Sequence, residues 1–269
     1  MFGFSKKKQA DSPKASWGRG IMSVVLLEGE SFPIDSFVKQ MAKTRVAGKA
    51  VSGVSRDEGG AFGFNVGDEL FALAHMPAPY PANDLEGPIA TSWMWPENPP
   101  IENVKQHRSF LLIYMTGGAA DPVRRRLTLT AVTALAAKQS GVMAVFWPQA
   151  TLVIFPRLFV DMSEEINSPQ APPLYLWVDL RAFRNADGTT GLFTTGLSQL
   201  GHMEIEIPSI DMEIGELREW LLNIMYYLLE KGPVLMDGQT IGTSAEDQIR
   251  IRHCPSSFGH PGKVIRLES

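Results

Sequence analysis

Three side chains that could act together chemically stand close in the sequence. His202, Glu204 and Glu206 occupy alternate positions, so on a β-strand all three project from one face. Imidazole and carboxylate groups are ligands for zinc or manganese, and one hypothesis is therefore a metal-assisted hydrolase that uses these three residues. The same alternation fits a half-exposed strand with a charged outer face, from which Glu204 and Glu206 would contact a partner protein.

A second cluster of charge consists of Arg124, Arg125 and Arg126, which follow a Gly-Gly pair at the start of a helix predicted from Pro122 to about Gln139. A glycine loop ahead of a helix can bind phosphate or another anion. The three arginines are therefore candidates for contact with an anion or an acidic partner. The spacing of a P-loop is absent, and the alternative is a solvated surface.

A proline-rich passage over residues 76–100 carries an aromatic pair, Trp93 and Trp95. Irregular passages of this length in a compact protein often carry function. Tryptophan is enriched in the hot spots of protein interfaces, so both residues are candidates for contact with a partner protein. In the alternative interpretation, both tryptophans pin the passage to the core.

The sequence contains no familiar catalytic motif. Neither a Gly-x-Ser-x-Gly elbow nor a His-Glu-x-x-His pair is present. Asp237-Gly238 is typical of a turn, and the neighbours His253 and Cys254 face opposite sides of a strand. His107, before an apolar strand, is expected to be a structural residue. Cys254 is the only cysteine, which excludes an internal disulfide and indicates a reduced thiol.

The composition indicates a soluble protein of the cytoplasm. The 269 residues carry a net charge of −4, which disfavours general nucleic-acid binding because that function needs a clustered basic surface. No stretch approaches the roughly 20 apolar residues of a membrane span. Residues 1–20 carry five basic residues against one acid and are predicted to form a flexible, solvated basic arm. The apolar run of a secretory signal does not follow them.

The order of the expected elements indicates an α+β protein. Strands are predicted over residues 21–28, 49–56, 69–75, 109–115 and 141–150, and helices over 33–41, 122–139 and 155–165. After a proline-rich linker at 167–173, strands are predicted over 174–180, 203–207, 234–236 and 248–253, with an edge strand at 264–267 and a long helix over 214–231. We expect two packed α/β-sandwich units, residues 21–166 and 174–269, with mixed, mostly antiparallel sheets. The long helix is apolar on almost every side and is expected to be buried on several.

Several short blocks resemble a known family. They are His107, Phe146-Trp147, Leu176-Trp177-Val178, Thr195-Gly196-Leu197, Gly201 with Glu204-Ile205-Glu206, and the run Asp237-Gly238-Gln239-Thr240-Ile241-Gly242. This succession is similar to a bacterial family catalogued as domain of unknown function 4261, over about residues 21–267, and the last three blocks are the specific ones. The resemblance implies a bacterial, soluble, mixed α/β domain and supplies no catalytic residues. Such domains are associated with toxin, immunity and secretion gene neighbourhoods.

We therefore expect a bacterial protein–protein interaction module. The most specific version of this hypothesis is an immunity or accessory protein of a toxin or secretion system. Such a protein would bind its partner through an acidic surface and aromatic loops. Neither nucleic acid nor a membrane is expected as a partner, no cofactor is expected, and a homodimer is left open. The rival hypothesis is the metal-assisted hydrolase.

Overall fold

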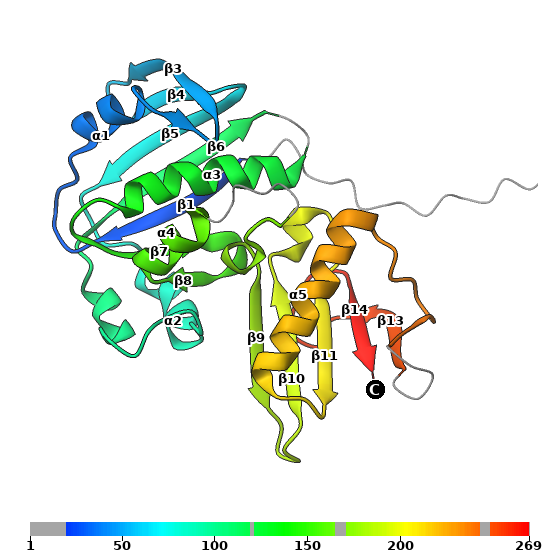
Figure 1. Cartoon of the computed structure of the whole chain (residues 1–269). Helices are drawn as coiled ribbons and strands as arrows, with labels where there is room; N and C mark the ends of the chain where they lie inside the picture. The colour runs from blue at the N-terminus through cyan, green and yellow to red at the C-terminus, as the bar shows by residue number, and fades with distance from the viewer. Residues whose placement is uncertain (1–19, 119–120, 165–170, 243–247, 269) are drawn as a thin grey trace, which may run out of the picture.

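The computed structural model describes residues 20–118, 121–164, 171–242 and 248–268. Nearly all of the predicted basic arm over residues 1–20, and most of the predicted linker over 167–173, lie outside the described residues. The described chain forms an eight-stranded and a six-stranded sheet together with helices (Figure 1). The protein is thus an α+β protein with two sheets, and its strand pairs are antiparallel with the exception of β11 and β14.

The eight-stranded sheet has the order β2-β3-β4-β5-β6-β1-β7-β8. Its strands are β1 (Ile21–Leu27), β2 (Arg45–Val46), β3 (Lys49–Arg56), β4 (Phe62–Val66), β5 (Glu69–Met76), β6 (Ser109–Gly117), β7 (Val142–Trp147) and β8 (Leu152–Ile154). β6 lies inside the sheet between β5 and β1. This position explains why residues 109–115 read as a continuous apolar run, since neither face of a central strand is fully solvated.

Helices cover the two faces of this sheet unequally (Figure 1). One face packs against α1 (Ile34–Met41), α3 (Pro122–Ala137) and α4 (Pro156–Glu164). On the other face, α2 (Ala82–Ala90) and the 3-10 helix η1 (Ile101–Gln106) pack over β1, β7 and β8. α3 begins as predicted, because the Asp121 carboxylate accepts hydrogen bonds from amides of the first turn and Pro122 follows it.

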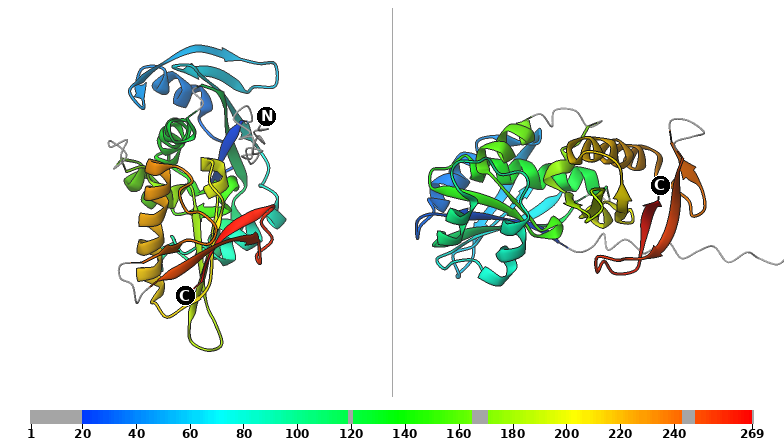
Figure 2. Two further views of the ribbon diagram at one scale, coloured as in Figure 1. Left: turned by 90° about the vertical axis from the view of Figure 1, so that its right-hand side faces the viewer. Right: turned by 90° about the horizontal axis from the view of Figure 1, so that it is seen from below.

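The six-stranded sheet has the order β12-β13-β14-β11-β10-β9. Its strands are β9 (Asp179–Arg184), β10 (Thr190–Thr195), β11 (Ile205–Ile210), β12 (Thr240–Ile241), β13 (Ile249–Pro255) and β14 (Lys263–Glu268). The long helix α5 (Ile214–Lys231) runs along one face of this sheet (Figures 1 and 2). Two short 3-10 helices, η4 (Leu174–Leu176) and η5 (Leu197–Leu200), lie next to the first sheet.

One continuous core joins the two sheets. The indole of the buried Trp177 donates a hydrogen bond to Thr130 of α3 at 2.9 Å. Gly196 has a φ of +113°, and a Cβ at this position would lie 2.4 Å from the carbonyl oxygen of Trp177 and 3.0 Å from Ala150. A residue without a side chain is therefore required at this contact between Gly196, Trp177 and Ala150.

The predicted long irregular passage over residues 76–100 is corrected by the structure, since α2 forms within it. Pro81 stands immediately before the first turn of α2, and Pro88 lies in its last turn. A proline ahead of the first turn costs no helical hydrogen bond, whereas Pro88 removes one amide donor from the last turn of α2. The prolines therefore mark the ends of a short helix rather than its absence.

The predicted strands of the second half also need correction. The strand expected over 174–180 begins only at Asp179, because Pro172 and Pro173 lead into the 3-10 turn η4. Residues 234–236 form no strand, and β14 lies inside the sheet rather than at its edge. β10, rich in threonine and glycine, was not predicted.

The expectation that the long helix is buried on several sides is correct in part. The fully buried residues of α5 form one stripe of Leu217, Leu221, Met225 and Leu228, whereas Tyr227 is 48% exposed. The other apolar residues of the helix are half-buried and also pack against the core: Trp220, Leu222, Ile224, Tyr226 and Leu229. None of the helices in the described ranges is long and apolar enough to cross a membrane.

Candidate functional site

A group of aromatic and arginine side chains lies on the six-stranded sheet, on the face opposite α5. Arg181 and Phe183 of β9, Phe193 of β10 and Arg266 of β14 project to this face, because they alternate with residues of the core under α5. Phe258 joins them from the loop between β13 and β14. We call these five residues the aromatic–arginine face. In the described chain, Figures 1 and 2 show no helix along it.

The aromatic side chains of this face pack on one another. The Phe258 and Phe193 rings are stacked with centroids 4.4 Å apart, and Phe183 lies 5.5 Å from Phe258. A Cβ on Gly191 would lie 2.2 Å from the Phe183 ring, so the glycine lets this ring lie across β10. All three phenylalanines remain only half-buried.

Arg181 is held in place beside these rings. Its guanidinium donates hydrogen bonds to the Asp179 carboxylate at 2.8 and 3.0 Å and to the Thr151 hydroxyl at 3.2 Å. The same guanidinium carbon stands 5.6 Å from the centre of the Phe193 ring, a cation–π distance. Burial raises the pKa of Asp179, and the charge of Arg181 opposes this effect.

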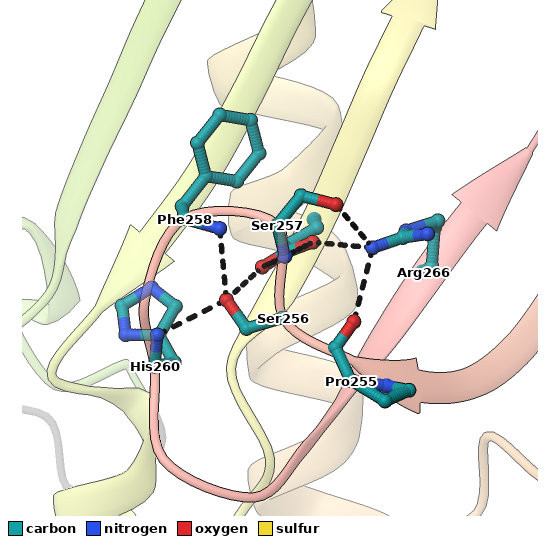
Figure 3. A network of polar contacts seen from close by, with 7 residues as sticks. Pro255, Ser256, Ser257, Phe258, His260 and Arg266 are labelled. Atoms are coloured by element: carbon teal, nitrogen blue, oxygen red, sulfur yellow. Dashed lines mark hydrogen bonds and ion pairs between the residues drawn. The ribbon is translucent and has the colours of Figure 1, made fainter.

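The loop that carries Phe258 is fixed by hydrogen bonds around Ser256, Ser257 and Arg266 (Figure 3), and Glu206 is their shared acceptor. This fully buried carboxylate accepts hydrogen bonds from the Ser256 hydroxyl at 2.5 Å, from the Ser257 amide at 3.1 Å and from Arg266 at 3.1 Å. Burial alone raises the pKa of Glu206, but these hydrogen bonds and the Arg266 charge together hold it below its ordinary value.

The Ser256 hydroxyl is fully occupied within the loop. It donates to Glu206 and accepts hydrogen bonds from the amides of Phe258 and His260, both at 3.0 Å. A serine nucleophile needs its proton directed to a base and its oxygen free to attack. The arrangement therefore shapes the loop, and it positions the Phe258 ring over β10.

The predicted metal ligands are not brought together. His202 lies before β11, and the Glu204 carboxylate turns towards η5, where it accepts hydrogen bonds from Thr194 at 2.6 Å and from the amides of Gly196 and Ser198 at 3.0 and 2.9 Å. Within the described ranges, no group of three or more His, Cys, Asp or Glu side chains is placed to hold a metal. The expectation that one strand face aligns these residues is wrong, because β11 begins only at Ile205.

The prediction that Glu204 and Glu206 form an exposed acidic contact surface is also wrong. Glu204 is 5% exposed and Glu206 is fully buried. Each carboxylate satisfies backbone amides of a neighbouring loop, a role that a sequence pattern of alternating charge does not distinguish from a solvated strand face. The neighbouring His202 is half-buried, and burial lowers its pKa.

The three arginines of α3 do not form one exposed cluster. Arg124 lies at the surface and pairs with Asp121 at 3.4 Å, with 76% of its side chain exposed. Arg125 and Arg126 are buried. Burial and the neighbouring Arg125 lower the pKa of Arg126 to about 10, and its guanidinium donates to the Pro122 carbonyl. The solvated surface is therefore wrong for Arg125 and Arg126, and contact of the three arginines with an anion or an acidic partner stays a prediction.

The two tryptophans make contacts inside the protein. The Trp93 indole donates to Asp179 at 3.0 Å, packs edge-on against Tyr175 and carries the Arg218 guanidinium 4.3 Å above its ring. Trp95 donates to the Pro99 carbonyl at 2.8 Å and packs against Phe155. Both side chains remain half-buried. These contacts favour the interpretation that both tryptophans attach the loop to the rest of the protein. Trp93 also connects the two sheets, because it hydrogen-bonds to Asp179 of β9.

Other residues singled out in the sequence have structural roles. Asp237 lies in a turn, and its carboxylate accepts a hydrogen bond from the His253 amide at 2.8 Å. His107 is buried, with Nδ1 2.7 Å from the Val104 carbonyl and Nε2 accepting from the Tyr80 amide. Cys254 is a free, half-buried thiol.

The aromatic–arginine face was missed by sequence reasoning. Its one local signal is the alternation of Arg181 with Phe183 and the position of Phe193 on the next strand. Bringing these side chains next to Phe258 and Arg266 requires the pairing of β9, β10, β11 and β14, which joins residues far apart in sequence. No local periodicity specifies this arrangement.

Comparison with known families gives one match. Residues 193–268 match the family described as "Domain of unknown function (DUF4261)". The matched residues contain the last three sequence blocks and most of the aromatic–arginine face, so the predicted resemblance is confirmed over this part of the chain. No curated protein and no solved structure matches the chain.

Proposed function

We propose that this protein is a protein–protein interaction module and that the aromatic–arginine face is its contact surface. The observation that carries this proposal is the stack of Phe258 on Phe193, half-exposed and flanked by Arg181 and Arg266. Aromatic residues and arginine are enriched at the centres of protein interfaces. Rings and guanidinium groups that are already held by neighbours lose little conformational freedom on binding.

The chemistry of this face favours an acidic partner segment. Arg181 uses Nε and Nη2 within the protein, while its Nη1 makes no hydrogen bond to the described residues and can donate to a carboxylate. Arg252 of β13 lies opposite Arg266 in the strand register. Its side chain is 55% exposed, and its guanidinium stands 3.8 Å from the Glu268 carboxylate at the margin of the face. Glu206 and Asp179 beneath the face are buried and already hydrogen-bonded.

We further assign the protein to the bacterial cytoplasm as an immunity or accessory protein of a toxin or secretion system. The family resemblance and the reduced state expected for Cys254 support this finer proposal. The alternative, a metal-assisted hydrolase using His202, Glu204 and Glu206, has no support from the geometry of these side chains. Sequencing the neighbouring genes tests the finer proposal, which an unrelated metabolic neighbourhood contradicts.

The contact surface is tested with matched variants of the full chain. Partners captured from a lysate of the source cells are identified by mass spectrometry and purified, and their affinity is then measured by calorimetry. Phe258→Ala should weaken binding by at least about 2 kcal/mol, the hot-spot threshold. Tyr227→Ala, on the opposite side of the same sheet, serves as control. Equal affinity of Phe258→Ala and wild type, with both proteins folded, contradicts the proposed surface.

A further inference from the structure

A hollow lies at the end of the eight-stranded sheet where β1 ends and where β6 and β7 begin. Its volume is about 580 Å³, inside the range of about 300–1,000 Å³ that small-molecule sites occupy. Glu28, just after β1, and Arg108, just before β6, line it together with Gly141, just before β7. We call it the β1–β6 hollow, and all of its lining residues belong to the described part of the chain.

The backbone around the β1–β6 hollow is fixed by hydrogen bonds between these three segments. The Glu28 amide donates to the Gly141 carbonyl at 2.9 Å. The Arg108 amide donates to the Leu27 carbonyl, also at 2.9 Å. Because Glu28 follows Leu27 directly, the side chains of Glu28 and Arg108 start from neighbouring backbone positions. A ligand bound there would require little rearrangement of the chain.

The two charged side chains of the β1–β6 hollow are not engaged with other groups of the protein. Glu28 and Arg108 are both exposed, and neither side chain makes a hydrogen bond or an ion pair with any residue that the structure describes. An exposed ion pair contributes only about 0–1 kcal/mol, so little holds the two charges to each other. Both are therefore free to bind groups of a ligand.

Uncharged polar groups complete the lining. The side chains of Ser31, Gln106 and Ser140 reach the hollow, and none of them is hydrogen-bonded within the described ranges. The backbone amides of Gly29 and Ser31 also have no acceptor among the described residues, whereas the Gly29 carbonyl accepts from the buried Ser109 hydroxyl at 2.7 Å. Amides and hydroxyls beside a guanidinium are suitable donors to a carboxylate.

The chemistry of the lining decides between classes of ligand. No aromatic side chain lines the hollow, so a nucleobase would have no ring on which to stack. A phosphate would meet Arg108 as its one basic residue and Glu28 as a like charge. A wholly apolar ligand would cover these polar groups without satisfying them. A small zwitterion satisfies both charges at once.

We propose that the β1–β6 hollow binds a free α-amino acid. Its carboxylate pairs with Arg108 and with the amides of Gly29 and Ser31, and its ammonium pairs with Glu28. An α-amino acid carries both charges on one carbon, which fits an acid and a base on neighbouring backbone positions. The half-buried Met143 of the lining gives the side chain of the amino acid an adaptable apolar surface. The proposal does not depend on the function proposed for the aromatic–arginine face, which lies on the other sheet.

Thermal unfolding of the full chain in the presence of each common free L-amino acid tests the proposal. At about 10 mM, at least one of them should raise the Tm of the wild type by about 2 °C or more, because it binds only the folded protein. Calorimetry then measures its Kd, which should rise at least about tenfold in Arg108→Gln and in Glu28→Gln, since each variant loses a charge-assisted hydrogen bond. Arg157→Gln on α4, where Arg157 is 83% exposed and pairs with Asp161, is the control and should bind as the wild type does.

Blocked derivatives of the same amino acid show whether both of its charges are recognised. The N-acetyl derivative lacks the ammonium and the amide derivative lacks the carboxylate, and each should bind at least about tenfold more weakly than the free amino acid. Equal binding of either derivative overturns the proposal. So does the absence of binding for every amino acid, and so does unchanged affinity in Arg108→Gln and Glu28→Gln when circular dichroism shows both variants folded.

Discussion

In the described part of the chain, each of the two sheets has one face that is only partly covered by helices (Figures 1 and 2), and the side chains on these two faces differ in chemistry. On the six-stranded sheet, phenylalanine rings stand between guanidinium groups that are anchored to buried carboxylates. On the eight-stranded sheet, the face of β5, β6 and β1 beyond Phe110 carries Met22, Leu70, Ala72, Tyr114 and Thr116, none of which is charged. Buried carboxylates thus hold charged side chains in place on one sheet, whereas the other sheet exposes only uncharged side chains at these positions.

Two buried carboxylates of the six-stranded sheet region anchor two different loops. Glu204 and Glu206 stand two residues apart and point to different loops, one to η5 and the other to the loop between β13 and β14. Each satisfies amides that would otherwise be buried without a partner. Loops next to the sheet can therefore be rigid without regular secondary structure, and this rigidity places Phe258 over the exposed face.

The largest effect is expected on the covered face of the six-stranded sheet. Leu221→Ala empties a fully buried site under α5 and should cost about 2–5 kcal/mol of unfolding free energy. Tyr227→Ala on the exposed side of the same helix should change it by less than about 0.5 kcal/mol. Urea unfolding followed by circular dichroism measures both. Similar losses for the two variants would show that α5 is covered on its outer side as well.

The loop anchors are the next largest contribution. Glu204→Ala leaves the Thr194 hydroxyl and the amides of Gly196, Leu197 and Ser198 without their acceptor. Buried groups left unsatisfied cost about 1–3 kcal/mol each before relaxation, so a loss of about 3 kcal/mol or more is expected. Glu204→Gln keeps one oxygen and should lose less. If Glu204→Ala unfolds at the wild-type urea concentration, water replaces the carboxylate and the anchor is unimportant.

Substitution of the two tryptophans compares the stability contributed by the contact between the two sheets with that contributed by a contact within the loop. Trp93→Ala removes the donor to Asp179 and the surface under Arg218 and should cost about 2–3 kcal/mol, below the usual 3–5 for a fully buried tryptophan. Trp95→Ala loses contacts only to Pro99 and Phe155 among the contacts described above and should cost less. Thermal unfolding of both variants is the measurement. A larger loss of stability for Trp95→Ala than for Trp93→Ala would show that the contacts within the loop contribute more than the contact between the sheets.

Much of the fold followed from local patterns, while the site did not. The strand over Ile21–Leu27, the central strand at 109–115, the Asp121-Pro122 helix start and the long helix over residues 214–231 were predicted correctly, since each has a strong periodic or capping signal. β14 was misplaced at an edge because its neighbours are set by parallel pairing with β11, a long-range contact.

The prediction of the site at residues 202–206 was wrong for a related physical reason. Alternation at residues 202–206 shows which side chains share a face only if a strand covers all of them, and β11 begins at Ile205. Burial of a carboxylate depends on donors that arrive from elsewhere, here the amides after Thr195 and Pro255. A charged residue in a half-apolar strand therefore reads as exposed until the loops that cover it are known.

The smallest effect concerns the titration of two carboxylates near the aromatic–arginine face. The pKa of Glu206 lies below its ordinary value of 4.5 in the folded protein, so the unfolded chain binds its proton more tightly. Its stabilisation is present above pH 4.5 and is lost as the pH falls through the folded pKa. The pKa of Asp179 is raised above 3.8, first by burial, so its contribution is greatest below pH 3.8 and is lost as the pH rises through the folded pKa.

Glu206→Gln and Asp179→Asn should therefore change the pH dependence of stability in opposite directions. The difference in unfolding free energy between wild type and Glu206→Gln, about 1–2 kcal/mol at neutral pH for lost charge-assisted hydrogen bonds, should shrink between pH 5 and pH 3. The wild-type protein should instead gain stability relative to Asp179→Asn as the pH falls over the same range, because protonation removes the free-energy cost of burying the charged carboxylate. Urea unfolding at several pH values measures both. Parallel profiles for the two variants would mean that the same environment governs both carboxylates, and the anchoring of the Phe258 loop by an ionised Glu206 would then be wrong.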